Sequence, residues 1–531
     1  MKHEVCRAAA IALTGLEGTA VMVEAAVSQQ LPGMAIIGLP DTALAEAKLR
    51  VRTATVQAGM PLADRFILVN LSPAALPKQG SGFDLAIALA ALAASHHLPA
   101  SRLAETAHLG ELGLGGELRR PAGLLTATVA ARELGFCRVM VPDEGGAEAA
   151  LVPGIEVIAV RDLAGAVAWH RGAEEGWRSV PHDTGGAREG GASASRNGGT
   201  VAISERHLNG AMDMSDVIGQ PEAVEALVIA AAGRHHVSLL GPPGTGKTLL
   251  ATRLPTILPD LTDDEAITAS SIASLGGSPL TALVQRPPFE SPHHTASSVA
   301  IIGGGSGGEV RAGAITRACH GVLFLDEAPE FPRGVLDSLR QPLESGIVEV
   351  HRSRVRASLP ARVQLVLAAN PCPCGYAGSP DTVAQCRCAA HTRVKYLQRI
   401  SGPLGDRIDL RLTVRRVPNV VLQDPGATPP TSRELRARVI RAREAAAHRL
   451  RDTPRQVNGE VSGTWLREPG MRPPRTDTAV LDQALTRGFI TMRGYDRTLR
   501  VAWTIADLAG RERPGRREIS QALVLRGGEL S

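Results

Sequence analysis

Aromatic side chains are scarce in this chain, with 7 Phe, 4 Trp and 3 Tyr among 531 residues, so its cores must consist of Ala, Leu, Val and Ile. Long apolar runs are also lacking, since the longest, Leu85–Ala94, is far shorter than the roughly 20 residues of a membrane helix. The start, MKHEVCRAAA, has neither a sustained apolar stretch nor a cleavage site for a secretory signal. Seven cysteines are too few for a disulfide framework. We therefore expect a soluble cytoplasmic protein with no membrane partner, long enough for roughly three domains.

Lysine is nearly absent, because only five of the 58 basic residues are lysine and the other 53 are arginine. A lysine at a chemically meaningful position therefore carries more information here than an arginine does. Positive charge is concentrated late in the chain, where residues 401–531 hold 24 Arg against 15 acidic residues. This charge suits a nucleic-acid partner, although a helical domain with a solvated basic face is the commoner cause.

The first third of the chain alternates strand-like and helix-like segments, which predicts an α/β domain over residues 1–170. The expected strands are Val21–Val27, Met34–Ile37, Phe66–Leu71 and Ile155–Val160, and the expected helices are Asp41–Ala58 and Asp84–Ala94. Residues 171–203 are rich in Gly and Ser without an apolar period, which is typical of a flexible linker.

A second α/β unit, over residues 204–425, predicts a doubly wound parallel sheet. Its expected strands are Val237–Leu240, Val322–Leu325 and Val363–Ala368. Residues 426–531 are rich in Arg and Ala and predict a helical domain. Its expected helices are Ser432–Arg451, Thr476–Arg487, Tyr495–Arg511 and Arg517–Leu525.

A phosphate-binding loop follows the strand Val237–Leu240. The residues are Gly241, Pro242, Pro243, Gly244, Thr245, Gly246, Lys247 and Thr248, a GxxxxGK[ST] pattern between a strand and a helix-forming stretch. Its glycines let backbone N–H groups surround a phosphate chain at a helix N-terminus. We expect Lys247 to reach the β- and γ-phosphates of ATP and Thr248 to bind Mg²⁺.

Two acidic residues, Asp326 and Glu327, end the next apolar strand, and Asn370 ends the one after it. In a phosphate-loop fold these strand ends face the nucleotide, so Asp326 is expected to hold Mg²⁺ and Glu327 to polarise the attacking water. Asn370 is expected to position that water or the γ-phosphate. The alternative for Asn370, which precedes a proline, is ordinary turn chemistry.

Four of the seven cysteines crowd into 17 residues, as Cys372-Pro-Cys374 and Cys386-Arg-Cys388, with His391 close behind. Four thiolates on two short arms can hold a structural Zn²⁺. The alternative is a set of four reduced cysteines in a cytosolic loop.

Several motifs together resemble the YifB/ComM family of magnesium-chelatase-like AAA+ ATPases. They are DVIGQ (216–220), GPPGTGKT (241–248), GVLFLDEAPEF (321–331), LAANPCPCG (367–375) and SGPLGDRIDL (401–410). The resemblance spans essentially the whole chain. It implies a Lon-protease-like N-terminal domain of the ribosomal-protein-S5 type, an AAA+ core and a helical C-terminal lid. It also implies a homo-hexameric motor that drives branch migration of DNA.

The resemblance also assigns two arginines. Arg407 matches the arginine finger, which stabilises charge in a neighbouring subunit's site; the alternative is a surface pairing with Asp406 or Asp409. Arg493 matches the second-sensor arginine of the lid, with Arg497 and Arg500 as rivals one and two turns later.

The N-terminal domain is expected to be inactive as a protease. Lon-like proteases use a Ser–Lys dyad, and the comparable segment here is Leu76–Gly82, with Lys78 and Ser81. A dyad needs a lysine some tens of residues after the serine, but none occurs between Lys78 and Lys247.

A basic hairpin is expected before the Asn370 strand. Two period-2 segments meet near Arg352 and Arg354, similar to the hairpin whose tip lines the pore of ring helicases. We expect Arg352 and Arg354 to bind DNA phosphates, with Arg356 a weaker candidate; the alternative is a solvated hairpin.

The sequence thus predicts an ATP-driven hexameric motor on branched or single-stranded DNA. The alternative is the motor subunit of a metal chelatase that inserts Mg²⁺ into a porphyrin. A regulator without motor activity would have damaged catalytic motifs, whereas these are intact.

Overall fold

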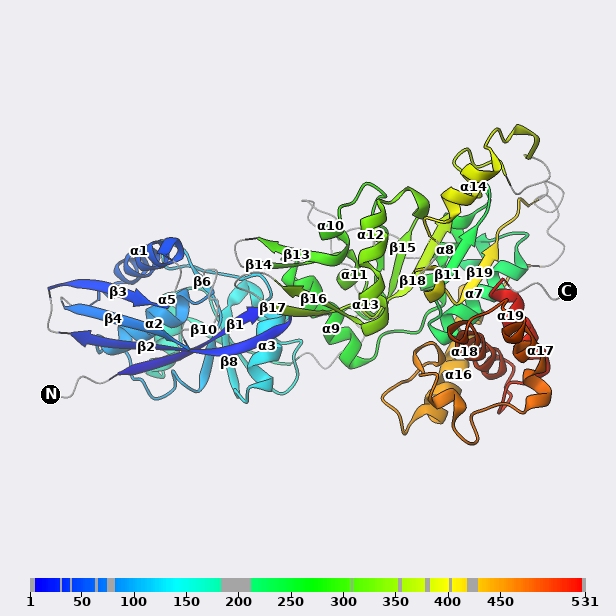
Figure 1. The fold of residues 1–531 in the computed structure, drawn as a ribbon. Coiled ribbons are helices and arrows are strands. Elements are labelled where there is room, and N and C mark those ends of the chain that lie inside the picture. The colour runs from blue at the N-terminus through cyan, green and yellow to red at the C-terminus, as the bar shows by residue number, and fades with distance from the viewer. Residues whose placement is uncertain are drawn as a thin grey trace.

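The computed structural model describes residues 5–28, 31–38, 41–62, 65–73, 82–182, 212–306, 309–351, 356–377, 383–400, 404–417 and 428–527. Three parts follow one another along the molecule: an N-terminal α/β part, a central α/β part and a helical C-terminal part (Figure 1). Among the described residues, no helix combines the length and the apolar character that crossing a membrane requires.

The N-terminal part is built on an eight-stranded mixed sheet in the order β10-β9-β8-β5-β1-β2-β4-β3. Its strands are β1 (Cys6–Thr14), β2 (Glu17–Ser28), β3 (Gly33–Ile37), β4 (Phe66–Ser72), β5 (Thr106–His108), β8 (Arg138–Pro142), β9 (Glu156–Val160) and β10 (Trp177–Val180). Its helices are α1 (Asp41–Gln57), α2 (Asp84–Ala94), α3 (Leu124–Glu133), α4 (Gly146–Ala149) and α5 (Leu163–Arg171). A small hairpin, β6 (Glu111–Leu112) and β7 (Leu118–Arg119), lies apart from the large sheet.

The strands and helices predicted for this part are present to within a few residues, and several others, such as β5, α3 and α5, were not predicted individually. Strand β1 was not expected, because CRAAAIALT is dominated by alanine and lacks a strand signature. Strand β10 pairs antiparallel with β9, although its residues lie within the stretch predicted to be a linker. Helix α2 has the predicted bounds and is buried along its whole length, as its Ala, Leu and Ile composition indicates.

The central part holds a five-stranded sheet, all of it parallel, in the order β12-β15-β18-β11-β19. Its strands are β11 (Val237–Leu240), β12 (Phe289–Glu290), β15 (Val322–Leu325), β18 (Gln364–Ala369) and β19 (Leu410–Thr413). Its helices of eight residues or more are α7 (Pro221–Gly233), α8 (Lys247–Ile257), α9 (Asp263–Leu275) and α14 (Ala390–Leu397). Shorter helices are α10 (Ser298–Ile302), α11 (Ala314–Arg317), α12 (Arg333–Ser338) and α13 (Arg340–Ser345). Because β15, β18 and β11 are parallel neighbours, the residues that follow these three strands lie close together at one edge of the sheet.

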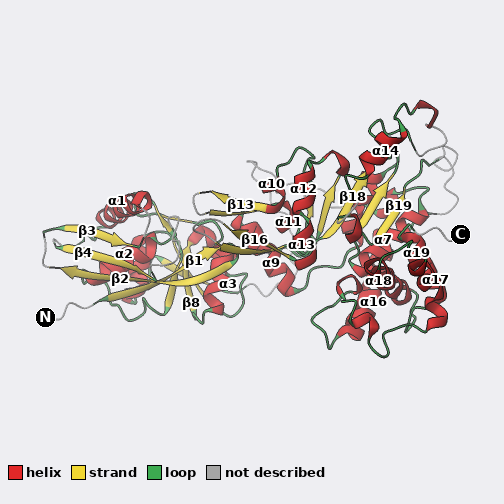
Figure 2. Cartoon of the chain, in the orientation of Figure 1, coloured by secondary structure: helices red, strands yellow, loops and turns green. Residues whose placement is uncertain are grey.

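Two antiparallel hairpins project from the central part toward the N-terminal part (Figures 1 and 2). They are β13 (Gly303–Ser306) with β14 (Glu309–Ala312), and β16 (Ile347–His351) with β17 (Arg356–Pro360). The second confirms the predicted pair of short strands. Its tip, with Arg352 and Arg354, lies outside the described residues.

The C-terminal part is helical, as predicted (Figure 2). Its helices are α16 (Ser432–Leu450), α17 (Arg475–Thr486), α18 (Met492–Leu508) and α19 (Arg516–Leu525). The buried Trp503 of α18 is covered on one side by the Arg449 guanidinium, 4.3 Å from the ring centre. Since Asp507 accepts hydrogen bonds from Arg449 at 2.6 and 2.8 Å, the same arginine ties α16 to α18.

A polar joint connects the N-terminal part to the central part, where α3 lies against α9. The hydroxyl of Thr126 donates to the Ser271 carbonyl at 3.0 Å, and the Gly123 N–H donates to the Ser274 carbonyl at 2.9 Å. Gly123 adopts a left-handed φ of 75°, and a Cβ there would lie 2.9 Å from Leu275 of α9. These buried contacts fix the two sheets relative to each other.

Candidate active site

The phosphate-binding loop lies between β11 and α8, as the sequence predicts. Gly244 and Gly246 have left-handed φ values of 76° and 86°, which glycine adopts without a steric penalty. Gly241 is needed for another reason, because a Cβ there would lie 2.3 Å from the Val414 carbonyl oxygen. The side chain of Gln220, from the segment DVIGQ, donates to the Thr245 carbonyl at 2.7 Å and supports the loop from outside.

Lys247 is the first residue of α8, and its side chain is folded into the loop. Its Nζ donates to the carbonyls of Gly241 and Pro242 at 2.7 and 2.8 Å and to Asn370 Oδ1 at 3.1 Å. Burial lowers the pKa of Lys247, while the nearby carboxylates of Asp326 and Glu327 counter that shift. A buried ammonium held largely by neutral acceptors is well placed to bind an anion such as a phosphate.

Thr248 and Asp326 converge from α8 and the end of β15. The Thr248 hydroxyl donates to Asp326 Oδ2 at 2.9 Å. A hydroxyl and a carboxylate are hard oxygen ligands of the kind that Mg²⁺ takes beside phosphates. The residues present therefore fit Mg²⁺ bound together with a nucleoside triphosphate.

Glu327 follows Asp326 with a left-handed backbone, at φ 50° and ψ 43°. Such a conformation is uncommon for a residue with a side chain and clusters at functional sites. The Glu327 carboxylate is half exposed and lies 3.5 Å from His294 Nδ1. His294 stands in the loop after β12, and its ring lies against His293 with centroids 4.1 Å apart.

His294 is a site residue that sequence reasoning missed. Its position after a two-residue strand gave little periodic signal. The available signal was the run Ser-Pro-His-His-Thr at 291–295, because adjacent histidines beside a turn-forming proline suit a site loop.

Asn370 lies at the end of β18, between the other two strand ends. Because its side chain accepts a hydrogen bond from Lys247, it is part of the site, whatever the turn chemistry of Pro371. The structure thus brings together Lys247, Thr248, Asp326, Glu327 and Asn370 at the carboxyl edge of the parallel sheet.

Arg407 is placed elsewhere. It lies just before β19, at the amino edge of the sheet, opposite the phosphate loop. Its Nη2 donates a hydrogen bond to Glu344 Oε2 at 2.6 Å, a partner that the sequence did not suggest.

The three arginines of α18 have different surroundings. Arg497 donates to buried Asp409 at 2.6 Å and to the Arg407 carbonyl at 2.9 Å. Burial raises the pKa of Asp409, but Arg497 and the two histidines just before β11, His235 and His236, hold that pKa well below its usual value. Arg500 is largely buried, and burial lowers its pKa. Arg493, at the start of α18, is exposed, whereas Arg497 and Arg500 are partly buried.

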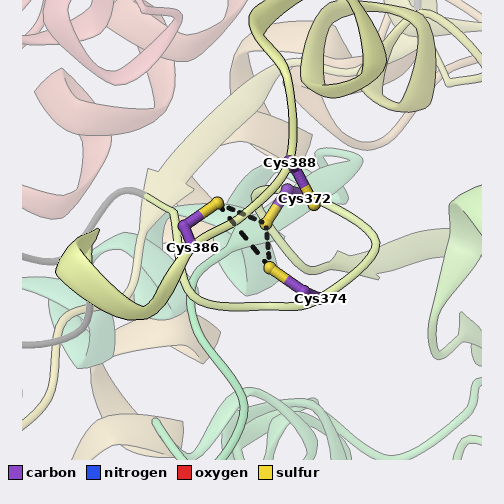
Figure 3. Close-up of side chains that lie close together, drawn as sticks. All are labelled: Cys372, Cys374, Cys386 and Cys388. Atoms are coloured by element: carbon purple, nitrogen blue, oxygen red, sulfur yellow. Dashed lines mark hydrogen bonds between the residues drawn. The ribbon is translucent and has the colours of Figure 1, made fainter.

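The four clustered cysteines come together beyond Asn370 (Figure 3). The Sγ atoms of Cys372, Cys374, Cys386 and Cys388 all lie within 4.8 Å of one another. All four are free thiols, and His391, which the sequence placed nearby, is not part of this group.

Two predicted features cannot be followed in the fold. Arg352 and Arg354 lie outside the described residues, and so do Lys78 and Ser81 of the segment compared with the Lon-type dyad. Arg356 is described: it is exposed at the start of β17, opposite His351.

Fold and site together define the class. The parallel sheet carries a GxxxxGK[ST] loop after β11, an Asp-Glu pair after β15 and an asparagine after β18, which lies between them. This combination is typical of a P-loop ATPase of the AAA+ type.

Comparisons with known proteins place the chain within that class. Three stretches match family models: residues 213–422 ("Magnesium chelatase, subunit ChlI"), 23–145 ("Subunit ChlI of Mg-chelatase") and 429–526 ("Magnesium chelatase, subunit ChlI C-terminal"). An uncharacterised protein of Mycobacterium tuberculosis is 44% identical over 522 residues, 98% of each chain. Competence protein ComM of Haemophilus influenzae is 38% identical over 512 residues, covering 96% of this chain and 95% of ComM.

The protein YifB of Escherichia coli is 36% identical over 521 residues, covering 97% of this chain and 96% of YifB. The chain therefore belongs to the YifB/ComM family of magnesium-chelatase-like AAA+ ATPases. A local similarity to an archaeal Lon protease of Archaeoglobus fulgidus, 46% over 59 residues, covers 11% of this chain and 8% of that protease.

Proposed function

We propose that this ATPase is a hexameric ring motor that acts on DNA, as a branch-migration helicase in recombination or natural transformation. The observation that carries the proposal is the convergence of Lys247, Asp326, Glu327 and Asn370 at one sheet edge, in a chain similar over almost its whole length to a competence protein. Competence is the uptake of DNA, so DNA would be the substrate along which such a motor moves.

The residues at the carboxyl edge have separate tasks in the proposed reaction. Lys247 leaves its carbonyl partners to contact the β- and γ-phosphates of ATP, and Asn370 holds the γ-phosphate or the attacking water. Glu327 takes the proton of that water as it attacks the γ-phosphorus. Bound Mg²⁺, held by Thr248 and Asp326, neutralises charge on the phosphate oxygens.

His294 has a positioning task in this scheme. Its contact of 3.5 Å with the Glu327 carboxylate restrains a side chain that is otherwise half exposed. Catalysis then requires Glu327 to face the attacking water.

The hairpin β16–β17 is the proposed DNA-contacting element. Strand β17 ends at Pro360, four residues before β18, and β18 carries Asn370 at its far end. A shift of β18 with the state of the γ-phosphate would therefore move the hairpin. Arg352 and Arg354 at its tip are proposed to contact DNA phosphates.

The alternative is the motor subunit of a metal chelatase, and it is favoured by the three matching family models, all of them of the chelatase subunit ChlI. In favour of the DNA motor, the competence protein ComM is similar to 96% of this chain, and positive charge is concentrated in residues 401–531. ATP hydrolysis separates the two functions. We expect branched DNA to stimulate hydrolysis by the wild-type chain and not by Glu327→Gln; stimulation only by a chelatase partner with its porphyrin would support the alternative.

The DNA-contacting hairpin has its own test. Arg352→Ala/Arg354→Ala removes two phosphate contacts and should flatten the salt dependence of DNA binding by a log–log slope of roughly 1.4 for single strands to 1.8 for duplex. Basal ATP hydrolysis should be unchanged. Arg356→Ala, on the flank, removes the weaker candidate contact and should have a smaller effect, and normal DNA binding by the double variant would contradict the assignment.

A further inference from the structure

The cysteine cluster beside the active site has the geometry of a metal centre. Cys372 and Cys374 stand on the segment that leaves β18 at Asn370, and Cys386 and Cys388 stand on the segment that leads into α14 (Figure 3). The two arms are 14 residues apart in sequence, yet their sulfurs form one group.

The spacing of the sulfur atoms matches a single tetrahedral ion. A Zn²⁺ with four Zn–S bonds of about 2.3 Å separates its sulfurs by about 3.8 Å. The Sγ of Cys372 lies 3.3 Å from Cys374 and 3.8 Å from Cys386, and Cys374 lies 3.6 Å from Cys386. These separations are far longer than the roughly 2.05 Å of a disulfide. Neutral thiols in mutual contact stabilise one another only weakly, whereas a cation strongly stabilises the thiolates that surround it.

The surroundings support the sulfurs as ligands. Cys372 is fully buried, and its Sγ accepts a hydrogen bond from the Ala377 N–H at 3.4 Å. Such an outer hydrogen bond orients a ligand and tunes a metal. Helix α14 begins two residues after Cys388, and the amino end of a helix favours negative charge.

The turn between the two arms also contacts the phosphate loop. Gly375 has a left-handed φ of 81°, and a Cβ there would lie 2.7 Å from Pro243 Cδ. Gly375 donates its N–H to the Cys372 carbonyl at 2.9 Å, which closes the turn. The turn that follows Cys374 therefore lies against the phosphate loop, and Cys372 is two residues from Asn370.

We propose that Cys372, Cys374, Cys386 and Cys388 bind one Zn²⁺, and that this ion positions Asn370 and the phosphate loop for nucleotide binding. Zinc joins the two arms, which holds the Gly375 turn against Pro243. The ion itself stays outside the reaction, because four protein ligands leave no open position. The second half of the proposal rests on the proposed nucleotide site, whereas the first half does not.

Metal content tests the zinc site directly. The full-length chain, purified without chelator, should contain about one zinc per chain. Cys388→Ser should lose most of it, and Cys137→Ser, an exposed cysteine on the N-terminal part, is the matched control that should keep it. Absence of stoichiometric metal from the wild-type chain, or equal zinc in Cys388→Ser, would overturn the site.

A second measurement covers the case in which Cys388→Ser does not fold. The wild-type chain is stripped of metal and reloaded with Co²⁺, whose absorption bands report sulfur ligation and tetrahedral geometry. Sulfur-to-cobalt charge transfer with one Co²⁺ per chain supports the site, and an octahedral spectrum without sulfur bands overturns it.

Nucleotide affinity tests the coupling. Zinc is removed by a chelator, excess Mg²⁺ is restored, and a fluorescent ATP analogue is titrated. If Asn370 loses its place, one hydrogen bond to a charged group is lost and the Kd should rise roughly 10-fold, with recovery when zinc is returned. An unchanged Kd would overturn the coupling. A chain that holds zinc but binds no nucleotide at all would instead contradict the proposed ATP site.

Discussion

The polar joint between the N-terminal and central parts should be far more sensitive to mutation than an exposed ion pair. At its centre Glu148 is almost fully buried and accepts hydrogen bonds from Arg120, from the Leu125 N–H at 3.2 Å and from the Ser274 hydroxyl at 2.6 Å. Arg120 also donates to the carbonyls of Gly277 and Ser278, which follow α9. Glu148→Ala removes the carboxylate that Arg120, the Leu125 N–H and the Ser274 hydroxyl share.

The magnitude follows from burial. Arg120 and Glu148 have side chains that are 10% and 2% exposed, so Glu148→Ala leaves a buried guanidinium unpaired. Such a loss costs about 3–5 kcal/mol of unfolding free energy. The Arg138–Glu156 pair, on β8 and β9 of the N-terminal sheet, is 36% and 49% exposed, so Glu156→Ala should cost less than about 1 kcal/mol.

Urea unfolding of the full-length chain, followed by tryptophan fluorescence, measures both variants. Trp169 and Trp177 report on the N-terminal part. A double-mutant cycle with Ser274→Ala then asks whether the joint forms in solution, and we expect a coupling of about 0.5–3 kcal/mol. Equal effects of Glu148→Ala and Glu156→Ala, or strict additivity with Ser274→Ala, would refute the reasoning.

Two further predictions concern single side chains. Lys247→Ala should weaken nucleotide binding, whereas Glu327→Gln should bind ATP and leave it unhydrolysed; a Glu327→Gln chain that hydrolyses ATP at the wild-type rate would refute the role of Glu327. Burial lowers the pKa of His320, but hydrogen bonds with Cys319 and Glu265 raise it to about 9, above the ordinary 6.5. His320 therefore stabilises the fold fully below about pH 6.5, and about 3 kcal/mol is lost as the pH rises to about 9. His320 has a left-handed φ of 63°, a conformation that asparagine tolerates, so His320→Asn is the control. The unfolding midpoint of His320→Asn should not show this dependence on pH.

The convergence of the candidate site residues could be predicted because each of them lies directly after a strand. The phosphate loop, Asp326 with Glu327, and Asn370 each follow an apolar strand directly, so finding the strand also places the side chain. Strands β11 and β15 have the predicted bounds, and in a parallel sheet their carboxyl ends share one edge. The order β15-β18-β11 then brings the three ends together without further information.

Contacts between distant segments could not be predicted in the same way. The hydrogen bond from Ser274 to Glu148 joins residues 126 positions apart, and neither residue belongs to a recognisable pattern. Likewise, nothing in the sequence around Glu344 indicates that it pairs with Arg407. Such contacts depend on how α9 packs against the N-terminal part and how α13 packs against the segment before β19, which periodicity does not encode.

The last prediction follows from the two edges of the central sheet. Lys247 follows β11 at the carboxyl edge, and Arg407 precedes β19 at the amino edge, where Asp409 accepts from the His236 N–H just before β11. Since β11 and β19 are parallel and four residues long, the edges are about 13 Å apart.

One chain therefore does not bring its own Arg407 to its own nucleotide, and we expect Arg407 to serve a neighbouring chain after leaving Glu344. Specific ATPase activity should then rise with protein concentration, and Arg407→Ala should abolish most of it. Mixing Arg407→Ala with Lys247→Ala chains should restore some hydrolysis, because one kind of mixed interface has both an intact loop and an intact arginine. Assembled mixed rings without any recovery would show that Arg407 does not act between chains.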